Sequence, residues 1–305
     1  MGAFKAPIEH ALARNTVQIL AGASANQLTS TGTGFFYQIT HPSTNHAKVL
    51  ILTNKHVVRG AAVVRFVLSA APAIADLDDS HQPRGRVDHA IVHPLAGNLV
   101  EHPDPEIDLC GIDITIPFGR VIQSGHQLRS MALTSDWLLD TADRKCMPDI
   151  QQTLVIGYPN GLWDSFNNMP IARRGTTATH AFARYAGKRS FLVDVAAFPG
   201  SSGSPVFAYE TPMYRLADGS FSPGTKAALI GVVWGVIERT VEGEMKAIEI
   251  PAALGHIPVL KTSLNLAIAL HADAVLEIDE IVFPGITAAK ASRGAKPLAS
   301  TELHE

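Results

Sequence analysis

The sequence predicts an all-β protein made of two groups of strands, with short helices near its ends. Short apolar runs separated by Gly, Pro, Asn and Asp recur along the 305 residues, as in chains with many short strands. Helical spacing is confined mainly to residues 8–14 and 262–275, and in the second segment Leu266 and Leu270 lie four residues apart. The polar, mixed segment 120–150 is the expected connection between the two groups of strands.

Ten apolar runs predict the strands of the two groups. Most of them alternate too imperfectly for a sheet with one exposed face, which is typical of barrel strands. In the first group they span residues 16–22, 32–40, 47–58, 62–70 and 108–116. In the second group they span residues 153–159, 173–185, 190–198, 204–209 and 227–238.

Composition and charge narrow the class of protein. With 46% hydrophobic residues, the chain can bury one large core or two smaller ones. A net charge of -3 gives no strong field for nucleic acid or an anionic membrane. Polar residues such as Glu9 and Arg14 interrupt the first 25 residues, so we expect neither a signal peptide nor a membrane helix. Because there are only two cysteines, Cys110 and Cys146, we expect a cytoplasmic protein without a disulfide framework.

Residues 200–205 read GSSGSP and allow two interpretations. Gly, Ser and Pro are ordinary residues of tight turns, so a plain turn explains them. Alternatively, Ser202 is a nucleophile, and the N–H groups of Gly200 and Ser202 bind the oxyanion that forms on the substrate. Gly200 suits this role because a residue without Cβ can adopt the required backbone twist. Ser201 and Ser204 are alternatives, but neither stands in a Gly-x-Ser-Gly position.

A serine nucleophile needs a base and a group that orients the base. We expect His56 to be the base, because it ends a strongly apolar run where a scaffold presents side chains to a cleft. Asp108 is the expected orienting carboxylate, since it stands at the entry to another apolar run. Asp104 and Asp113 compete with Asp108, but the first lies in a Pro-flanked loop and the second lies further into the strand.

Four motifs in one order, GTGFFY, LTNKHVV, IDLCGIDI and FPGSSGSPVF, resemble the trypsin/chymotrypsin-like peptidases. The likeness spans roughly residues 15–250 and is closest to the disulfide-free bacterial branch that includes the HtrA proteases. It implies two six-stranded antiparallel barrels that meet at a cleft, with His56 and Asp108 from the first and Ser202 from the second. Ser201 stands where animal digestive members carry Asp, so we expect their zymogen switch to be absent.

The resemblance also sets the expected domain limits. Nothing after residue 250 is long enough for a PDZ domain. The peptidase domain is expected over 1–260, with barrels at 15–125 and 151–250, a connection at 126–150, and a C-terminal helix and mobile tail at 261–305.

In this family, substrate specificity depends on the residue six positions before the nucleophile and on a strand that pairs with the substrate. The first is Ala196, which offers no buried countercharge to Lys or Arg, so small or medium apolar side chains are expected to be preferred. A shift of the loop that carries Asp194, eight positions before Ser202, would change this expected preference. The loop at 157–175 is expected near the cleft, as a lid or a regulatory contact. The substrate-pairing residues are expected to be Val233, Trp234 and Gly235.

The sequence thus predicts a serine endopeptidase that acts on proteins or peptides, with no nucleic-acid or membrane partner and room for a regulatory protein partner. An inactive peptide-binding module on the same fold and an esterase are the alternatives. No cofactor and no metal is expected, because His89, His93 and His102 lack Cys or Glu at ligand spacing. Cys110 is expected to fill a core position rather than act as a nucleophile.

Overall fold

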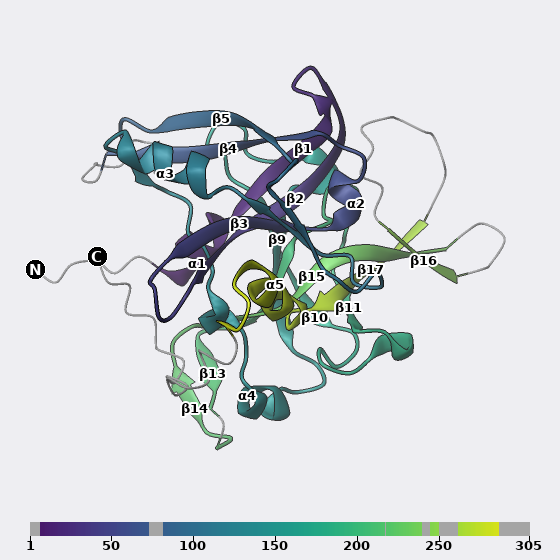
Figure 1. The fold of residues 1–305 in the computed structure, drawn as a ribbon. Helices are drawn as coiled ribbons and strands as arrows, with labels where there is room; N and C mark the ends of the chain where they lie inside the picture. Colours follow the sequence, from purple (N-terminus) through teal and green to yellow (C-terminus); the bar gives the residue numbers. More distant parts are fainter. Residues whose placement is uncertain (1–6, 73–81, 217, 240–244, 250–261, 287–305) are drawn as a thin grey trace, which may run out of the picture.

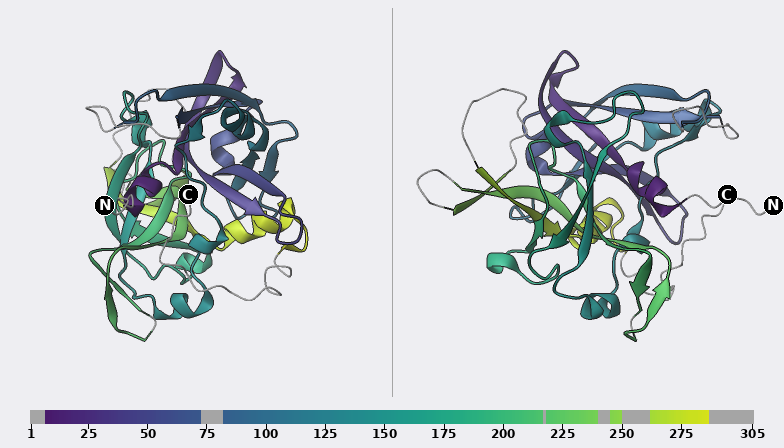
Figure 2. Two further views of the ribbon diagram at one scale, coloured as in Figure 1. Left: turned by 90° about the vertical axis from the view of Figure 1, so that its left-hand side faces the viewer. Right: turned by 180° about the vertical axis from the view of Figure 1, so that it is seen from behind.

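The computed structural model describes residues 7–72, 82–216, 218–239, 245–249 and 262–286. Two β-structured halves lie one above the other, and the rotated views keep them apart (Figures 1 and 2). The upper half holds the strands up to residue 128, and the lower half holds those from residue 152 onward. The chain is therefore mostly β, as the pattern of short apolar runs predicts.

The N-terminal half is an antiparallel sheet that stays open. Its strands are β1 (Thr16–Ser24), β2 (Gln27–Thr40), β3 (Ala47–Thr53), β4 (Val63–Ala71), β5 (Val87–Pro94), β6 (Leu99–Glu101), β7 (Cys110–Asp113) and β8 (Gln127–Leu128). Their order is β5-β4-β1-β2-β3-β7-β6, and β8 pairs with β4. Within the described residues no pairing joins β5 to β6, because β6 has only three residues and packs against a C-terminal helix. The prediction of a closed barrel in this half is wrong.

The C-terminal half is a closed antiparallel barrel of six strands, as predicted. Pairing runs in a ring β12-β9-β10-β11-β17-β15 and returns to β12, while β16 extends β15 outside the ring. A separate hairpin, β13–β14, follows β12. These strands are β9 (Gln152–Gly157), β10 (Ile171–Thr177), β11 (Ser190–Asp194), β12 (Pro205–Glu210), β13 (Met213–Arg215), β14 (Phe221–Pro223), β15 (Lys226–Arg239), β16 (Met245–Glu249) and β17 (Thr262–His271).

The helix predicted over 262–275 is a strand for most of its length. Residues of β17 pair with both β11 and β15, so this segment closes the barrel rather than following it. Leu266 and Leu270, four residues apart, fit a strand period of two as well as a helical period. A helix begins only at Ala274. The mobile tail expected at 287–305 lies outside the described residues.

The helices are short and lie between or after the strands. The one predicted at 8–14 is α1 (Ile8–Ala13). The others are α2 (Lys55–Val58), α3 (Thr115–Gln123), α4 (Thr141–Cys146) and α5 (Ala274–Val282), with 3-10 turns at η1 (Ser135–Trp137), η2 (Pro159–Gly161) and η3 (Tyr185–Gly187). In the part of the chain that the structure describes, none has the length and apolar character needed to span a bilayer.

A shared apolar cluster joins the two halves. Phe35 and Leu52 from the sheet pack with Phe207 and Leu229 from the barrel, and all four side chains are fully buried. Burial of one such side chain is worth about 1.5–3 kcal/mol, so the cluster fixes the halves against each other. Separate clusters fill the sheet and the barrel. The candidate site lies where these two halves meet.

Candidate active site

His56 lies in the short helix α2, directly after the apolar strand β3. The apolar run predicted as a strand includes His56, but the observed strand ends at Thr53, three residues earlier. The helix α2 therefore carries the imidazole. Val57 and Val58 are buried in the core of the sheet and anchor α2 there. A Cβ on Gly32 would lie 2.6 Å from the Val57 side chain, so the neighbouring strand β2 can approach α2 only because residue 32 is glycine.

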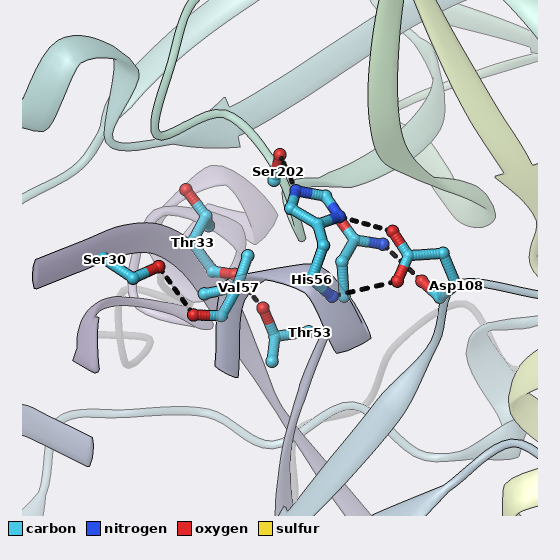
Figure 3. Close-up of polar contacts among 8 residues, drawn as sticks. Ser30, Thr33, Thr53, His56, Val57, Asp108 and Ser202 are labelled. Atoms are coloured by element: carbon cyan, nitrogen blue, oxygen red, sulfur yellow. Dashed lines mark hydrogen bonds and ion pairs between the residues drawn. The ribbon is translucent and has the colours of Figure 1, made fainter. Parts of the chain in front are cut away.

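Asp108 holds His56 at two points (Figure 3). The backbone N–H of His56 donates to Asp108 Oδ1 over 3.1 Å, and the ring Nδ1–H donates to Oδ2. The Asn54 side chain donates to the Asp108 carbonyl over 2.6 Å, which fixes the backbone that carries the carboxylate. Because Asp108 accepts from Nδ1, the ring leaves its Nε2 lone pair available.

The two competing aspartates point elsewhere. Asp113 accepts from Lys48 Nζ over 2.9 Å and from the Thr115 hydroxyl over 2.6 Å. Asp104 accepts from the backbone N–H of Glu106 over 2.9 Å, within its own loop. Of the three carboxylates, Asp108 is the one that reaches His56.

Ser202 completes the arrangement from the other half of the molecule. Its Oγ lies 2.8 Å from His56 Nε2, on the opposite side of the ring from Asp108 (Figure 3). Ser202 has no exposed surface, and the His56 side chain is 4% exposed. Burial shields this row of hydrogen bonds from competing water, which strengthens them. The arrangement can move a proton from the serine hydroxyl to the imidazole while a carboxylate faces the cation that forms.

The turn before Ser202 is shaped by Gly200. Its φ of +90° belongs to the left-handed region, and a Cβ there would lie 2.4 Å from the Tyr158 carbonyl oxygen. The Asn160 N–H donates to the Pro199 carbonyl. In a trans peptide the C=O and the following N–H point in opposite directions, so this contact turns the Gly200 N–H away from Asn160. Within the described residues, the N–H groups of Gly200 and Ser202 donate to no protein acceptor.

Thr33 binds the turn to the N-terminal sheet, and the sequence interpretation did not single it out. Its hydroxyl donates to the Gly200 carbonyl over 2.8 Å and accepts from the Tyr158 N–H over 3.0 Å. Its backbone N–H donates to the Ser202 carbonyl over 2.8 Å. A polar residue between two glycines in the strand motif GTGFFY was the available signal, since glycines mark a close backbone approach. Asn160, in the loop expected near the cleft, was also missed.

The neighbouring serines have other surroundings. The Ser201 hydroxyl accepts from the Phe198 N–H over 3.2 Å and so closes the turn locally. The Ser204 hydroxyl is buried and has no hydrogen-bond partner in the structure. Neither contacts His56 through a hydrogen bond among the described residues, so Ser202 is the serine that the structure brings to the imidazole.

Ala196 is half-buried, between two residues that face the barrel core. Val195 and Ala197 on either side of it are buried in the cluster that fills the barrel. Asp194 is exposed and lies opposite Thr176 of β10. The carboxylate of Asp194 is therefore not buried beside Ala196.

The strand residues expected to bind substrate already have partners on the same chain. Val233 is fully buried, and its N–H and carbonyl bind Ser204 and Gly203. Gly235 lies opposite Glu249 of β16. Trp234 lies between them at an irregularity of the strand, half-buried, with its Nε1–H buried and unpartnered. Because Val233 and Gly235 are already paired, Trp234 is the remaining position of the three at which a substrate strand can pair with the backbone.

A cavity of about 360 Å³ opens beside Asp108 and Trp234. Asp104 and Glu106 line one part of its wall, while Arg184, Lys188 and Arg189 contribute positive charge. Lys188 Nζ lies 3.4 Å from Glu106 Oε2, and both side chains are well exposed. Charges of both signs thus border the space next to Asp108.

Cys110 is fully buried in the core of the sheet, as predicted. Burial raises the pKa of its thiol far above the ordinary value, with a smaller contribution from Asp108. A thiol without thiolate character is a poor nucleophile. The histidines weighed as metal ligands make separate contacts: His93 Nε2 lies 2.9 Å from the Asp113 carbonyl, and His102 Nε2 lies 2.9 Å from Glu277 Oε2.

One family model and several solved structures are similar to the chain. Residues 32–211, more than half of the chain, match the family model described as the trypsin-like peptidase domain. No curated protein matches the chain in sequence. Among solved structures, the thermostable serine protease AL20 from an extremophilic microorganism is 14% identical, with a TM-score of 0.44 over 89% of this chain and 98% of that one. The Rv3671c protease from M. tuberculosis, in its active form, is 16% identical, with a TM-score of 0.41 over 88% of this chain and 81% of that one. Likenesses this distant say nothing about the site.

Proposed function

Since the chain belongs to the trypsin-like peptidase domain family and is a serine protease, we propose that Ser202, His56 and Asp108 form its catalytic triad. The observation that carries the proposal is the continuous row from the Asp108 carboxylate through the imidazole to Ser202 Oγ, 2.8 Å from Nε2. Substrates of a peptidase are proteins or peptides, and we propose that this chain cleaves them internally, as an endopeptidase.

In the proposed reaction, Ser202 Oγ attacks a peptide carbonyl as His56 Nε2 takes its proton. Asp108 holds the imidazole in the productive tautomer and stabilises the imidazolium that forms. His56 then returns the proton to the leaving amine, and an acyl-serine remains. Water repeats the sequence and releases the acid. The double contact from Asp108 to His56 supports this order of roles because it leaves Nε2 of the ring to face Ser202 Oγ.

The N–H groups of Gly200 and Ser202 are the proposed oxyanion donors. Both are free of protein acceptors among the described residues, and Asn160 keeps the Gly200 N–H turned away from its own loop. Donors that are fixed before reaction cost no reorganisation in the transition state. Loss of one such donor typically costs roughly 3–4 kcal/mol of barrier.

Small or medium apolar side chains are the proposed preference before the scissile bond. Ala196 supports this, since it provides no charge to a Lys or Arg side chain and the exposed Asp194 is not buried beside it. A cation without a buried partner there would lose its hydration without compensation. Trp234 is the proposed contact for the substrate backbone at the strand edge, where it lies at an irregularity of β15 between two paired residues.

A fluorophosphonate probe tests the nucleophile, because it forms a covalent adduct only with an activated serine. The wild-type protein should be labelled, while Ser202→Ala should not be labelled. Ser204→Ala is the matched control, since it removes a neighbouring buried hydroxyl without a partner, and it should retain labelling. Labelling that persists in Ser202→Ala would reject Ser202 as the nucleophile.

Peptide and ester substrates then separate the alternatives. An endopeptidase digests a denatured-protein peptide library at internal bonds, whereas an esterase releases only the ester product. A folded wild-type protein that neither labels nor turns over would instead be a binding module. We also propose a cytoplasmic location, which the small number of cysteines, two in 305 residues, supports.

A further inference from the structure

Three arginines meet at a small hollow away from the candidate catalytic residues. Arg14 follows α1, Arg86 precedes β5, and Arg129 follows β8. The hollow has a volume of about 30 Å³, enough for two or three water-sized groups. Three apolar side chains, those of Ala13, Val67 and Met169, also line it. The remaining side chains of its wall are neutral and polar, and they are Thr16, Ser69, Gln82, Ser130, Asn167 and Asn168. No Asp or Glu of the described residues lines it.

The arginines are only partly satisfied by the protein. Arg14 Nη1 donates to the His10 carbonyl over 3.1 Å. Arg86 Nη2 donates to the Phe166 carbonyl over 2.6 Å and lies 3.3 Å from Asp88 Oδ2. The Nη1 groups of Arg86 and Arg129 are buried without any hydrogen-bond partner. The Arg129 side chain makes no hydrogen bond or ion pair with any described residue.

Three cations this close raise one another's free energy. Burial lowers the pKa of Arg129 to about 10, and the positive charges of Arg14 and Arg86 contribute to the shift, whereas Asp88 opposes it. Asp88 is already bound by Arg86 and by the Ser69 hydroxyl over 2.7 Å. A half-buried guanidinium with an orphaned N–H group is unfavourable in isolation, and an anion would compensate it.

We propose that this hollow binds a tetrahedral oxyanion, a phosphate group that is either free or the end of a small phosphomonoester. Guanidinium groups match phosphate oxygens through paired, charge-assisted hydrogen bonds. The orphaned Nη1 groups of Arg86 and Arg129 supply charged donors, and the Thr16 hydroxyl, buried without a partner, supplies a neutral one. The hollow has room for about two or three phosphate oxygens, so the rest of the ligand lies in solvent.

The hollow is connected to the candidate oxyanion turn through one loop. Arg86 binds the Phe166 carbonyl, and the Asn168 side chain donates to Ser69 Oγ over 2.9 Å. The same loop begins at η2, where the Asn160 N–H binds the Pro199 carbonyl. A bound phosphate that ties residues 167 and 168 to the sheet therefore steadies the segment that orients Gly200. This coupling between the hollow and Gly200 rests on the proposed function. It predicts that peptide hydrolysis is faster in the presence of phosphate.

Binding is tested on the Ser202→Ala protein, so that the result does not depend on catalysis. The melting temperature is followed as sodium phosphate replaces sodium chloride at constant ionic strength, and the affinity is measured by calorimetry. Phenyl phosphate in a parallel titration distinguishes a monoester ligand from the free ion. The site requires saturable stabilisation by at least one of the two, while sodium chloride gives none.

Arg129→Gln should weaken the binding of phosphate by roughly ten- to a hundred-fold, the loss expected for a hydrogen bond to a charged group. In phosphate-free buffer the same variant should melt at the same or a higher temperature, because an uncompensated buried cation is gone. Arg120→Gln on α3 removes an exposed arginine outside the hollow and should change neither property. Equal stabilisation of wild type and Arg129→Gln by phosphate, or no stabilisation of either, would overturn the site.

The coupling to catalysis has its own readout. Turnover of a peptide substrate by the active protein should rise with phosphate, and Arg129→Gln should abolish the rise while keeping its phosphate-free turnover. Saturable binding with unchanged turnover would overturn the coupling and leave the site standing. A protein that binds phosphate but has no turnover in any condition would contradict the proposed function and not the site.

Discussion

The carboxylate of Asp108 binds His56 twice, once at the backbone N–H and once at ring Nδ1. One residue thus fixes both the position of the short helix α2 and the orientation of the ring that it carries. The two contacts use the two oxygens of the same carboxylate, so a rotation of that side chain would break both of them. The geometry of the proposed base therefore depends on a single side chain.

Replacement of Asp108 by Asn should separate these two effects. The new side chain keeps one carbonyl oxygen and the same shape, so the fold should survive, but its amide cannot stabilise an imidazolium. We expect kcat to fall by about 10⁴-fold, the typical loss when the orienting carboxylate is removed from a serine protease. Steady-state kinetics measures the loss, and circular dichroism checks the fold. A decrease of less than about ten-fold would contradict the role of Asp108.

Thr33→Val should weaken the junction between the sheet and the proposed oxyanion turn. The valine leaves the Gly200 carbonyl and the Tyr158 N–H buried without their partner. Each unsatisfied group costs about 1–3 kcal/mol, so the free energy of unfolding and the turnover should both fall. Thr31→Val on the same strand is the control, because the buried Thr31 hydroxyl has no partner, and it should unfold no more easily than wild type. Equal effects of the two variants in chemical denaturation would contradict the role of Thr33.

Gly200→Ala should damage the proposed oxyanion turn. The added Cβ meets the Tyr158 carbonyl oxygen at 2.4 Å and places an L-residue at a φ of +90°. The turn must shift to relieve this, and kcat should fall by about 10²–10³-fold, as for the loss of an oxyanion donor. Gly97→Ala imposes a similar φ of +76° in open space and isolates the backbone strain from the clash. That control should lower stability slightly and leave kcat near wild type.

Acid should destabilise the fold partly through His271. This residue of β17 is 6% exposed, and its Nε2 lies 3.2 Å from the Ala183 carbonyl. Burial lowers its pKa below the ordinary value of 6.5 with help from Arg189, while Asp273 acts in the opposite direction. The unfolded chain then binds the proton more readily, so stability present above pH 6.5 is lost as the pH falls below it.

The His271→Gln variant keeps an amide donor and removes the titration. Its melting temperature should therefore depend less on pH than that of wild type between about pH 8 and about pH 5. Differential scanning calorimetry across this range measures the difference. Parallel curves for the two proteins would show that His271 contributes nothing to the acid sensitivity.

The two thiols should differ in reactivity. Cys146 is exposed, whereas Cys110 is buried and burial raises its pKa. Iodoacetamide should therefore modify Cys146 alone in the native protein and both residues after denaturation. Peptide mapping by mass spectrometry assigns the adducts. Modification of Cys110 in the native state would contradict the closed packing of the sheet around it.

The sequence predicted the three aligned residues because each stands in a local pattern that needs no knowledge of long-range contacts. His56 follows an apolar strand, Asp108 opens another, and Ser202 stands in a glycine turn. Thr33 carries only a weak local mark, its two flanking glycines, and Asn160 carries none. Their importance comes from hydrogen bonds to Gly200 and Pro199, which lie far along the chain and which only the tertiary structure brings close.

The errors in the predicted fold have the same origin. A spacing of four between Leu266 and Leu270 is shared by strands and helices, and only pairing with β11 and β15 decides between them. Closure of the N-terminal sheet depends on whether its two edge strands can meet. The short β6 instead packs against α5, a helix near the other end of the chain, which no local pattern predicts.

The apolar cluster between the halves suggests that the protein can be divided into two fragments that reassemble. His56 and Asp108 lie on the sheet side, and Ser202 lies on the barrel side. A chain divided between β8 and β9 therefore yields two fragments that each lack part of the proposed catalytic triad. Fused to two proteins that associate, such fragments would regain peptide cleavage only when Phe35 and Leu52 again meet Phe207 and Leu229. The rate of peptide hydrolysis would then measure how far the two fragments have reassembled.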